Sequence, residues 1–226
     1  MEEAAAVADE LVAETYERRF TDSDALQKHA IWREICRYLQ RYVDPGSTVL
    51  DLACDRGYFI ENITAAQRWA TDIRDVSEYL SSGVRFAQSD GLEADRVLPN
   101  ETFDVVFMSN YLEHLPSPAD VIEQLRVTKR LLRPGGTVMV LQPNIRLVGG
   151  AYWDFIDHKV ALTERSLAEA AELAGLTTTR VITRFLPFTT KSRLPQHPLA
   201  VRTYLALRPA WFVLGKQTLY LGQRPL

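Results

Sequence analysis

The chain has 226 residues, of which 46% are hydrophobic and 24% are charged, so it has the composition of a folded protein with a sizeable core rather than of a disordered chain. Its formal net charge of -3 gives no general attraction to polyanions, and nucleic acid is not expected as a partner. Cys36 and Cys54 lack metal-ligand spacing and favour a reducing compartment. The acidic N-terminus and the lack of a long apolar run predict a cytoplasmic protein without a transmembrane segment. The oligomeric state stays open.

The N-terminal part of the chain is expected to be helical. Ile31, Ile35 and Leu39 recur at helical spacing, which predicts a helix over residues 25–42. Pro45 and Gly46 then stop it before the first strand.

Seven later segments are short and rich in β-branched or apolar residues, which is typical of strands buried on both faces of a sheet. They cover residues 47–53, 67–73, 84–90, 103–109, 136–143, 177–185 and 216–223. Helical segments are expected over residues 75–82, 117–132 and 163–175. Ser117 and Thr163 are the predicted caps of the last two, and Pro118 and Gly175 are further boundary signals. This alternation predicts an α/β fold with a doubly wound, mostly parallel, seven-stranded sheet.

The connection between the last two strands, at about residues 186–215, is too long for a hairpin loop. We interpret it as an insertion with its own short helix. Its basic and aromatic residues are either a solvated face or a flap over a bound molecule.

In an open α/β sheet, ligands bind outside the carboxyl ends of the strands. The first such loop lies in VLDLACDRGYF, where a turn into a short helix would offer free backbone N–H groups to an anionic ligand. Only Gly57 of a G-x-G-x-x-G dinucleotide fingerprint is present. A nicotinamide-dependent oxidoreductase is therefore disfavoured.

Five segments in order, VLDLACDRGYF, WATDIRD, AQSDGLEA, FDVVFMSNYLEHL and LRPGG, resemble the class I S-adenosylmethionine-dependent methyltransferases. The resemblance spans roughly residues 48–144, and the motifs SNYLEHL and YWDFIDH resemble a bacterial branch of the same superfamily. It implies a Rossmann-like methyltransferase fold and S-adenosylmethionine as cofactor. The implied acceptor is a small molecule or a glycan or lipid, methylated preferably at oxygen. LRPGG is expected to form a tight turn.

The length of the chain and the lack of a linker predict a single domain over residues 1–226, and the resemblance makes it a methyltransferase domain. Residues 1–46 are its expected N-terminal helical cap, residues 47–144 its cofactor-binding half, and residues 145–226 its acceptor-side half.

The resemblance also assigns cofactor contacts. In the family, the turn after the first strand cradles the amino-acid end of the cofactor, and here it contains Asp51, Ala53, Asp55 and Gly57. Asp72, with Ile73 beside it, matches the residue that accepts the two ribose hydroxyls. Asp90, followed by Gly91, matches the residue that binds the adenine amino group, and Asn110 would lie over the methionine part. Ala53 and Asp55 stand where the family has a glycine-rich turn, and Asp55 adds a negative charge near the cofactor carboxylate.

The acceptor is expected to lie against the segments that follow the fourth and fifth strands. The predicted acceptor-binding residues are Tyr111, Glu113, Asn144, Tyr152 and Trp153. His114 and His158 are the candidate catalytic bases, because imidazole takes up a proton near neutral pH. Structural roles for both histidines remain open.

Two alternatives to this function are retained. The departures at Ala53 and Asp55 are compatible with a non-catalytic or weakly cofactor-binding protein on a methyltransferase scaffold. A lower-ranked alternative is a metal-assisted RNA 2′-O-methyltransferase. The small-RNA 2′-O-methyltransferases bind a divalent metal with a Glu-His pair and a distant His, and the similar residues here are Glu113, His114 and His158. Asn110 stands where their first metal-binding Glu would fall, so no metal is expected.

Overall fold

A computed structural model describes residues 22–188 and 197–226 of the chain, and any N-terminal helix within residues 1–21 lies outside the described part. The strands are β1 (Thr48–Leu52), β2 (Gln67–Asp72), β3 (Val84–Gln88), β4 (Phe103–Ser109), β5 (Leu132–Pro143), β6 (Thr177–Leu186) and β7 (Gln217–Gln223). They form one seven-stranded sheet in the order β3-β2-β1-β4-β5-β7-β6. The first five strands are parallel, and β7 runs antiparallel to both β5 and β6. The predicted fold class is confirmed.

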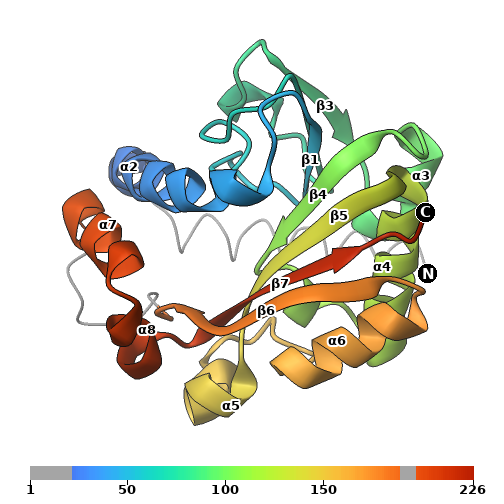
Figure 1. The fold of residues 1–226 in the computed structure, drawn as a ribbon. Helices are drawn as coiled ribbons and strands as arrows, with labels where there is room; N and C mark the ends of the chain where they lie inside the picture. The colour runs from blue at the N-terminus through green and yellow to red at the C-terminus, as the bar shows by residue number, and fades with distance from the viewer. Residues whose placement is uncertain (1–21, 189–196) are drawn as a thin grey trace.

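Helices cover both faces of this sheet (Figure 1). The α-helices are α2 (Asp22–Leu39), α3 (Ala94–Val97), α4 (Pro118–Leu131), α5 (Ile145–Val148), α6 (Glu164–Leu173), α7 (Pro198–Ala206) and α8 (Arg208–Leu214). The 3-10 helices are η1 (Gln40–Tyr42), η2 (Ser77–Tyr79), η3 (Gly91–Glu93), η4 (Leu112–His114) and η5 (Gly149–Asp154). Within the described ranges, no helix is both long and apolar enough to cross a bilayer.

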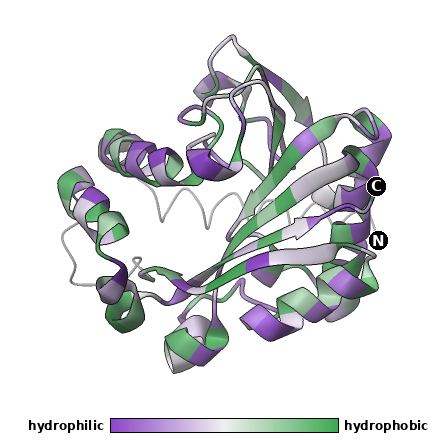
Figure 2. Ribbon diagram, in the orientation of Figure 1, coloured by the Kyte–Doolittle hydropathy of each residue, from purple (hydrophilic) through white to green (hydrophobic). Residues whose placement is uncertain are grey.

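The hydrophobic core has two parts, one on each face of the sheet. Leu125 and Leu131 of α4 and Leu167 of α6 bury their side chains against one face. Leu39 of α2 and Trp211 of α8 do so against the other. Figure 2 shows the corresponding hydrophobic residues along the central strands and on α8. Because both faces are covered, a ligand reaches the sheet at its edges, where the strands end.

The predicted helix boundaries are mostly confirmed. Ser117 Oγ accepts a hydrogen bond from the backbone N–H of Asp120 at the start of α4, and Pro118 is the first residue of that helix. Thr163 and Ser166 form a reciprocal capping box at the start of α6. The insertion, however, contains two helices, α7 and α8, rather than one.

Three local predictions were wrong. Residues 75–82 form only the short η2, because so short a polar segment gains little from an isolated helix. The loop after β1 forms successive turns rather than a short helix, since left-handed residues in it cannot join a right-handed helix. LRPGG lies within β5. Backbone hydrogen bonds between Arg224 and both Gly135 and Gly136 hold this segment to the chain that follows β7.

Candidate active site

Three of the predicted aspartates lie at the same edge of the sheet. Asp51 is in β1, Asp72 ends β2, and Asp90 follows β3. The order β3-β2-β1 makes these strands neighbours, and all three run in parallel. β1 also pairs with β4, so successive strands are added on one side of β1 up to β3 and on its other side from β4 onward. Such a switch point is where ligands bind in this class of sheet.

The loop after β1 has the backbone of a glycine-rich turn without most of its glycines. Ala53 has a φ of 58°, Asp55 of 50° and Gly57 of 70°. These values lie in the left-handed region, which costs residues other than glycine roughly 1–2 kcal/mol. Backbone strain of this kind collects at functional sites, where the surrounding structure enforces it. The substitutions at 53 and 55 therefore leave the shape of the turn intact.

Asp51 is buried, with 3% of its surface exposed. Its Oδ2 accepts a hydrogen bond of 3.3 Å from the backbone N–H of Ile60. Burial raises the pKa of Asp51 well above its usual range, and the nearby Asp72 and Asp55 act in the same direction. The folded protein therefore favours the protonated, neutral form of Asp51.

Arg74 is a site residue that the sequence analysis missed. Its Nη2 lies 2.9 Å from Oδ1 of Asp55 and its Nε lies 3.0 Å from Oδ1 of Asp72. Oδ2 of Asp72 also accepts a 2.9 Å hydrogen bond from the backbone N–H of Asp55. A ribose diol would therefore compete with Arg74 for this carboxylate. The only signal in the sequence is a basic residue two positions after Asp72.

Asp90 and Gly91 lie just after β3, at the same edge of the sheet. Oδ1 of Asp90 accepts a 2.9 Å hydrogen bond from the backbone N–H of Leu92 and caps η3. A Cβ atom at Gly91 would lie 2.3 Å from the hydroxyl oxygen of Tyr111. That hydroxyl donates to Oε1 of Gln124 on α4 at 2.9 Å. The hydroxyl of Tyr111 is therefore directed at η3 and α4. The predicted contact of Tyr111 with the acceptor would have to be made by its ring carbons instead.

The loop after β4 begins at Asn110, which is exposed and has a φ of 48°. Its backbone N–H donates to the carbonyl of Leu141 in β5 at 2.8 Å, which anchors the loop across the sheet. Glu113 follows in η4 with only 1% of its surface exposed, and neither carboxylate oxygen has a hydrogen-bond partner. Burial raises the pKa of Glu113. A buried carboxylate without partners is costly and needs a chemical reason.

The structure brings the two predicted catalytic histidines together. The backbone carbonyl of Glu113 accepts hydrogen bonds from the N–H groups of Lys159 and Val160, at 2.8 and 3.0 Å. These bonds hold the segment after η5 against η4, and the rings of His114 and His158 lie 5.0 Å apart between centroids. The two histidines are separated by more than forty positions in sequence, so this proximity comes from the fold.

Hydrogen bonding orients His114. Its Nδ1 lies 3.1 Å from the backbone carbonyl oxygen of Asp157 and 3.4 Å from Oδ2 of the same residue. A carbonyl oxygen can only accept, so Nδ1 carries a proton and donates. Nε2 is then the nitrogen with the free lone pair in the neutral ring.

The other predicted acceptor residues differ in their surroundings. Tyr152 is fully buried and donates a 2.5 Å hydrogen bond to the carbonyl of Val160, and its ring lies 4.6 Å from that of His158. The side chain of Asn144 is buried and caps α5. Direct acceptor contacts by these two side chains do not fit the structure, because their polar atoms are used inside the protein. Trp153 is 54% exposed and stays a candidate.

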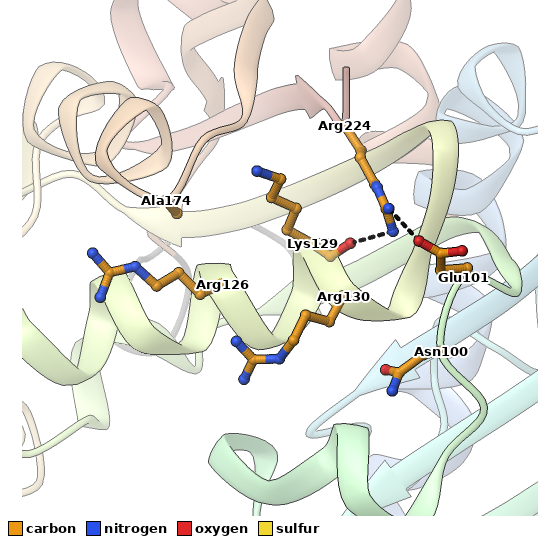
Figure 3. A pocket seen from close by; sticks show the side chains of 7 residues that line it. All are labelled: Asn100, Glu101, Arg126, Lys129, Arg130, Ala174 and Arg224. Atoms are coloured by element: carbon orange, nitrogen blue, oxygen red, sulfur yellow. Dashed lines mark hydrogen bonds and ion pairs between the residues drawn. The ribbon is translucent and has the colours of Figure 1, made fainter. Parts of the chain in front are cut away.

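A cavity of about 520 Å³ lies elsewhere, at the opposite edge of the sheet (Figure 3). Asn100 and Glu101 in its lining precede β4, so it sits at the amino end of that strand. Its basic side chains are largely paired: Arg130 with Asp95 and Glu123, Arg126 with Glu123, and Arg224 with Glu101. Because ligands of this fold bind at the carboxyl ends, this cavity is not the candidate site.

Comparison with known proteins agrees with the geometry. Residues 26–181 match the model of the methyltransferase domain family. The ubiquinone biosynthesis O-methyltransferase of Aeromonas salmonicida is 29% identical over 154 residues, which are 58% of this chain and 63% of that protein. Its counterpart from Pseudomonas paraeruginosa is 35% identical over 106 residues, which are 42% of this chain and 44% of that protein. The chain thus matches less than two thirds of the length of either relative.

A solved structure shows the same fold. The SAM-dependent methyltransferase from Archaeoglobus fulgidus is 20% identical to this chain, with a TM-score of 0.60. The superposition covers 85% of this chain and 94% of that protein. The family match covers the strands β1 to β5 and both histidines of the site. The chain therefore belongs to the methyltransferase domain family, and it shares its fold with this solved methyltransferase.

Proposed function

We propose that this enzyme transfers the methyl group of S-adenosylmethionine to a hydroxyl of a small-molecule, glycan-type or lipid-type acceptor. The observation that carries this proposal is His114, whose Nδ1 is held by Asp157 so that Nε2 is left as a base. A hydroxyl is a poor nucleophile until its proton is removed, and a positioned imidazole performs that step. The printed names of the two curated relatives describe O-methyltransferases, which supports oxygen as the acceptor atom.

The residues at the carboxyl edge fit the cofactor. The left-handed turn at Ala53 and Asp55 presents backbone to a ligand, and the carboxylates of Asp55 and Asp72 suit the positively charged amino and sulfonium groups. In this proposal Asp72 receives the ribose and Asp90 the adenine amino group. Ile73, 43% exposed, and Gly91 lie beside them, and Asn110 faces the methionine end. S-adenosylmethionine supplies a methyl group on a good leaving group.

The chain itself has to align the acceptor and take one proton. The acceptor oxygen attacks the methyl carbon in line with the sulfonium, the carbon–sulfur bond breaks, and its electron pair stays on sulfur as a neutral thioether. The hydroxyl proton passes to Nε2 of His114. Asp157 stabilises the imidazolium that forms, because it accepts the hydrogen bond from Nδ1. His158, whose ring lies 5.0 Å from that of His114 between centroids, is the second candidate base.

The charge of the C-terminal part favours an acidic acceptor. After Glu172 the chain contains eight Lys and Arg residues and no Asp or Glu, although the whole protein carries a net charge of -3. α7 and α8 belong to this segment, and Arg202 and Arg208 on them are exposed. We therefore place a phosphate-bearing or otherwise acidic glycan or lipid first among the acceptors. A cytoplasmic location is part of the proposal, in keeping with two buried free thiols.

The test is a methyl-transfer assay with S-adenosylmethionine and a panel of hydroxylated acceptors, comprising phenols, sugars and sugar phosphates. We expect turnover with a hydroxyl acceptor, and a fall in kcat of about 10²–10⁴-fold in His114→Ala. The Kd for S-adenosylmethionine, measured by calorimetry, should stay the same in that variant. Methylation confined to amines, or full turnover by His114→Ala, would contradict the proposal.

A further inference from the structure

Glu113 has surroundings that its role in the fold does not explain. Its side chain is 1% exposed, and neither Oε1 nor Oε2 has a hydrogen-bond partner. The backbone carbonyl of the same residue, in contrast, accepts two hydrogen bonds. The fold therefore uses the Glu113 backbone to join two segments and leaves the carboxylate unsatisfied. An ionised carboxylate in this position needs a cation beside it.

Two imidazole rings lie next to this carboxylate. One ligand atom each from Glu113, His114 and His158 falls within 4.8 Å of the other two. We propose that these three side chains bind one divalent transition-metal ion, of the class to which Zn²⁺ belongs. The inference deepens the proposed function, on which its catalytic consequence rests, because it names what would activate the acceptor oxygen.

The donor set selects the class of metal. Two imidazole nitrogens and one carboxylate oxygen suit zinc and other first-row dications, whereas Mg²⁺ and Ca²⁺ prefer oxygen ligands only. Bonds of about 2.0–2.2 Å in a tetrahedral site place the ligand atoms about 3.3–3.6 Å apart. The observed limit of 4.8 Å is wider by about 1.2–1.5 Å, so the three side chains would have to rotate toward one another when the ion binds. Three protein ligands leave a coordination position open for an acceptor oxygen.

The surroundings of the three side chains hold them in place. Nδ1 of His114 donates to the Asp157 carbonyl at 3.1 Å, the outer contact that metal-binding histidines usually make. The ring of His158 contacts those of Tyr152 and Phe155, with centroid distances of 4.6 and 5.0 Å. The backbone bonds from Lys159 and Val160 to the Glu113 carbonyl fix the two segments relative to each other. These contacts hold the three side chains close to one another.

A metal here changes how the acceptor loses its proton. The lone pair of His114 Nε2 can take a proton or a metal ion, but not both. With the ion bound, the acceptor hydroxyl coordinates to it and ionises near neutral pH, and its proton passes to water. The oxygen–methyl bond then forms and the sulfur–methyl bond breaks, as in the metal-free scheme. The histidines act as ligands in this case rather than as bases.

The experiment measures metal binding separately from activity. Protein stripped with a chelator is titrated with Co²⁺, whose visible absorption reports its coordination, and with Zn²⁺ by calorimetry. We expect wild type to bind one equivalent, and Glu113→Gln and His158→Ala to bind at least about 10–100-fold more weakly, because even the loss of a hydrogen-bond partner of a metal ligand costs that much. Glu169→Gln on the exposed side of α6 and His197→Asn at the start of α7 are the matched controls, and both should bind like wild type. Thermal unfolding with and without Zn²⁺ shows whether each variant is folded and whether the ion stabilises it.

The outcomes separate this inference from the proposed function. The metal site is overturned if the stripped, folded wild type binds Co²⁺ and Zn²⁺ no more tightly than Glu113→Gln does. Methyl transfer that persists in chelator and still requires His114 also overturns it, while leaving the hydroxyl methylation in place. One tightly bound Co²⁺ that Glu113→Gln and His158→Ala lose supports the site, even if no hydroxyl acceptor is methylated.

Discussion

The backbone N–H of Asp55 donates a 2.9 Å hydrogen bond to Oδ2 of Asp72. This bond joins the loop after β1 to the end of β2, so the two parts of the expected cofactor site depend on one carboxylate. Arg74 contacts both acids and partly neutralises them. A change at Asp72 should consequently affect cofactor binding both directly and through the shape of the neighbouring loop.

Asp72→Ala should therefore weaken the binding of S-adenosylmethionine and of its demethylated product. Losing charge-assisted hydrogen bonds costs about 1.5–3 kcal/mol each, which corresponds to at least a tenfold rise in Kd. Calorimetric titration of both ligands measures it. Asp75→Ala is the matched control, because Asp75 is exposed and bonds only to the nearby Ser77 among the contacts described. An unchanged Kd in Asp72→Ala would remove this residue from the site.

Ala53→Gly should stabilise the protein. Ala53 has a φ of 58°, and glycine adopts this conformation without the steric cost of a Cβ atom. The relief of about 1–2 kcal/mol exceeds the entropic cost of glycine, so we expect a gain of up to about 1 kcal/mol in the free energy of unfolding. Urea denaturation gives this value. Ala94→Gly, at a right-handed and buried position, should instead lose stability, and a loss at both positions would show that the turn is not strained.

Gly91→Ala should be destabilising by about 1–3 kcal/mol, the usual cost of overpacking. The new Cβ would lie 2.3 Å from the hydroxyl oxygen of Tyr111 and 2.8 Å from Oε1 of Gln124. Combining it with Tyr111→Phe removes the hydroxyl, so the double variant should lose less than the sum of the single losses. Gly150→Ala is the control, since a Cβ there has no atom within 4 Å. Strict additivity would indicate that Tyr111 lies elsewhere.

Asp51→Asn should alter stability in a pH-dependent way. Burial raises the pKa of Asp51 above its ordinary value of 3.8, so the folded state favours the protonated form. The ionised carboxylate thus destabilises the fold as pH rises above the unfolded-state value, and this cost is absent below it. We expect Asn to raise Tm relative to wild type more at pH 8 than at pH 4. Calorimetric melting at both values tests this, and an equal difference at both would contradict the raised pKa.

Trp153→Ala should raise the KM for the acceptor while leaving kcat and the cofactor Kd unchanged. Trp153 is 54% exposed beside Tyr152, whose ring contacts that of His158, so it can contact a bound acceptor without supporting the fold. A lost contact worth about 1 kcal/mol gives roughly a fivefold rise in KM. Steady-state kinetics with the best acceptor of the panel provides the measurement. A fall in kcat at constant KM would instead give Trp153 a role in the transition state.

The sequence by itself determined the strands and the edge of the sheet at which the candidate site lies. All seven strands appear where apolar, β-branched runs predicted them, because burial on both faces of a parallel sheet demands such runs. Asp51, Asp72 and Asp90 fall at the ends of neighbouring strands, since parallel strands place their carboxyl ends together.

Only the tertiary structure decided which side chains meet across that edge. Arg74 joins Asp55 and Asp72, and the Glu113 carbonyl holds the segment of His158 beside His114. The buried hydrogen bonds of Asn144 and Tyr152 likewise appear only after packing. The periodicity of apolar residues in the sequence does not predict such contacts. Each of them joins residues that are distant in sequence or depends on a side-chain direction that packing selects.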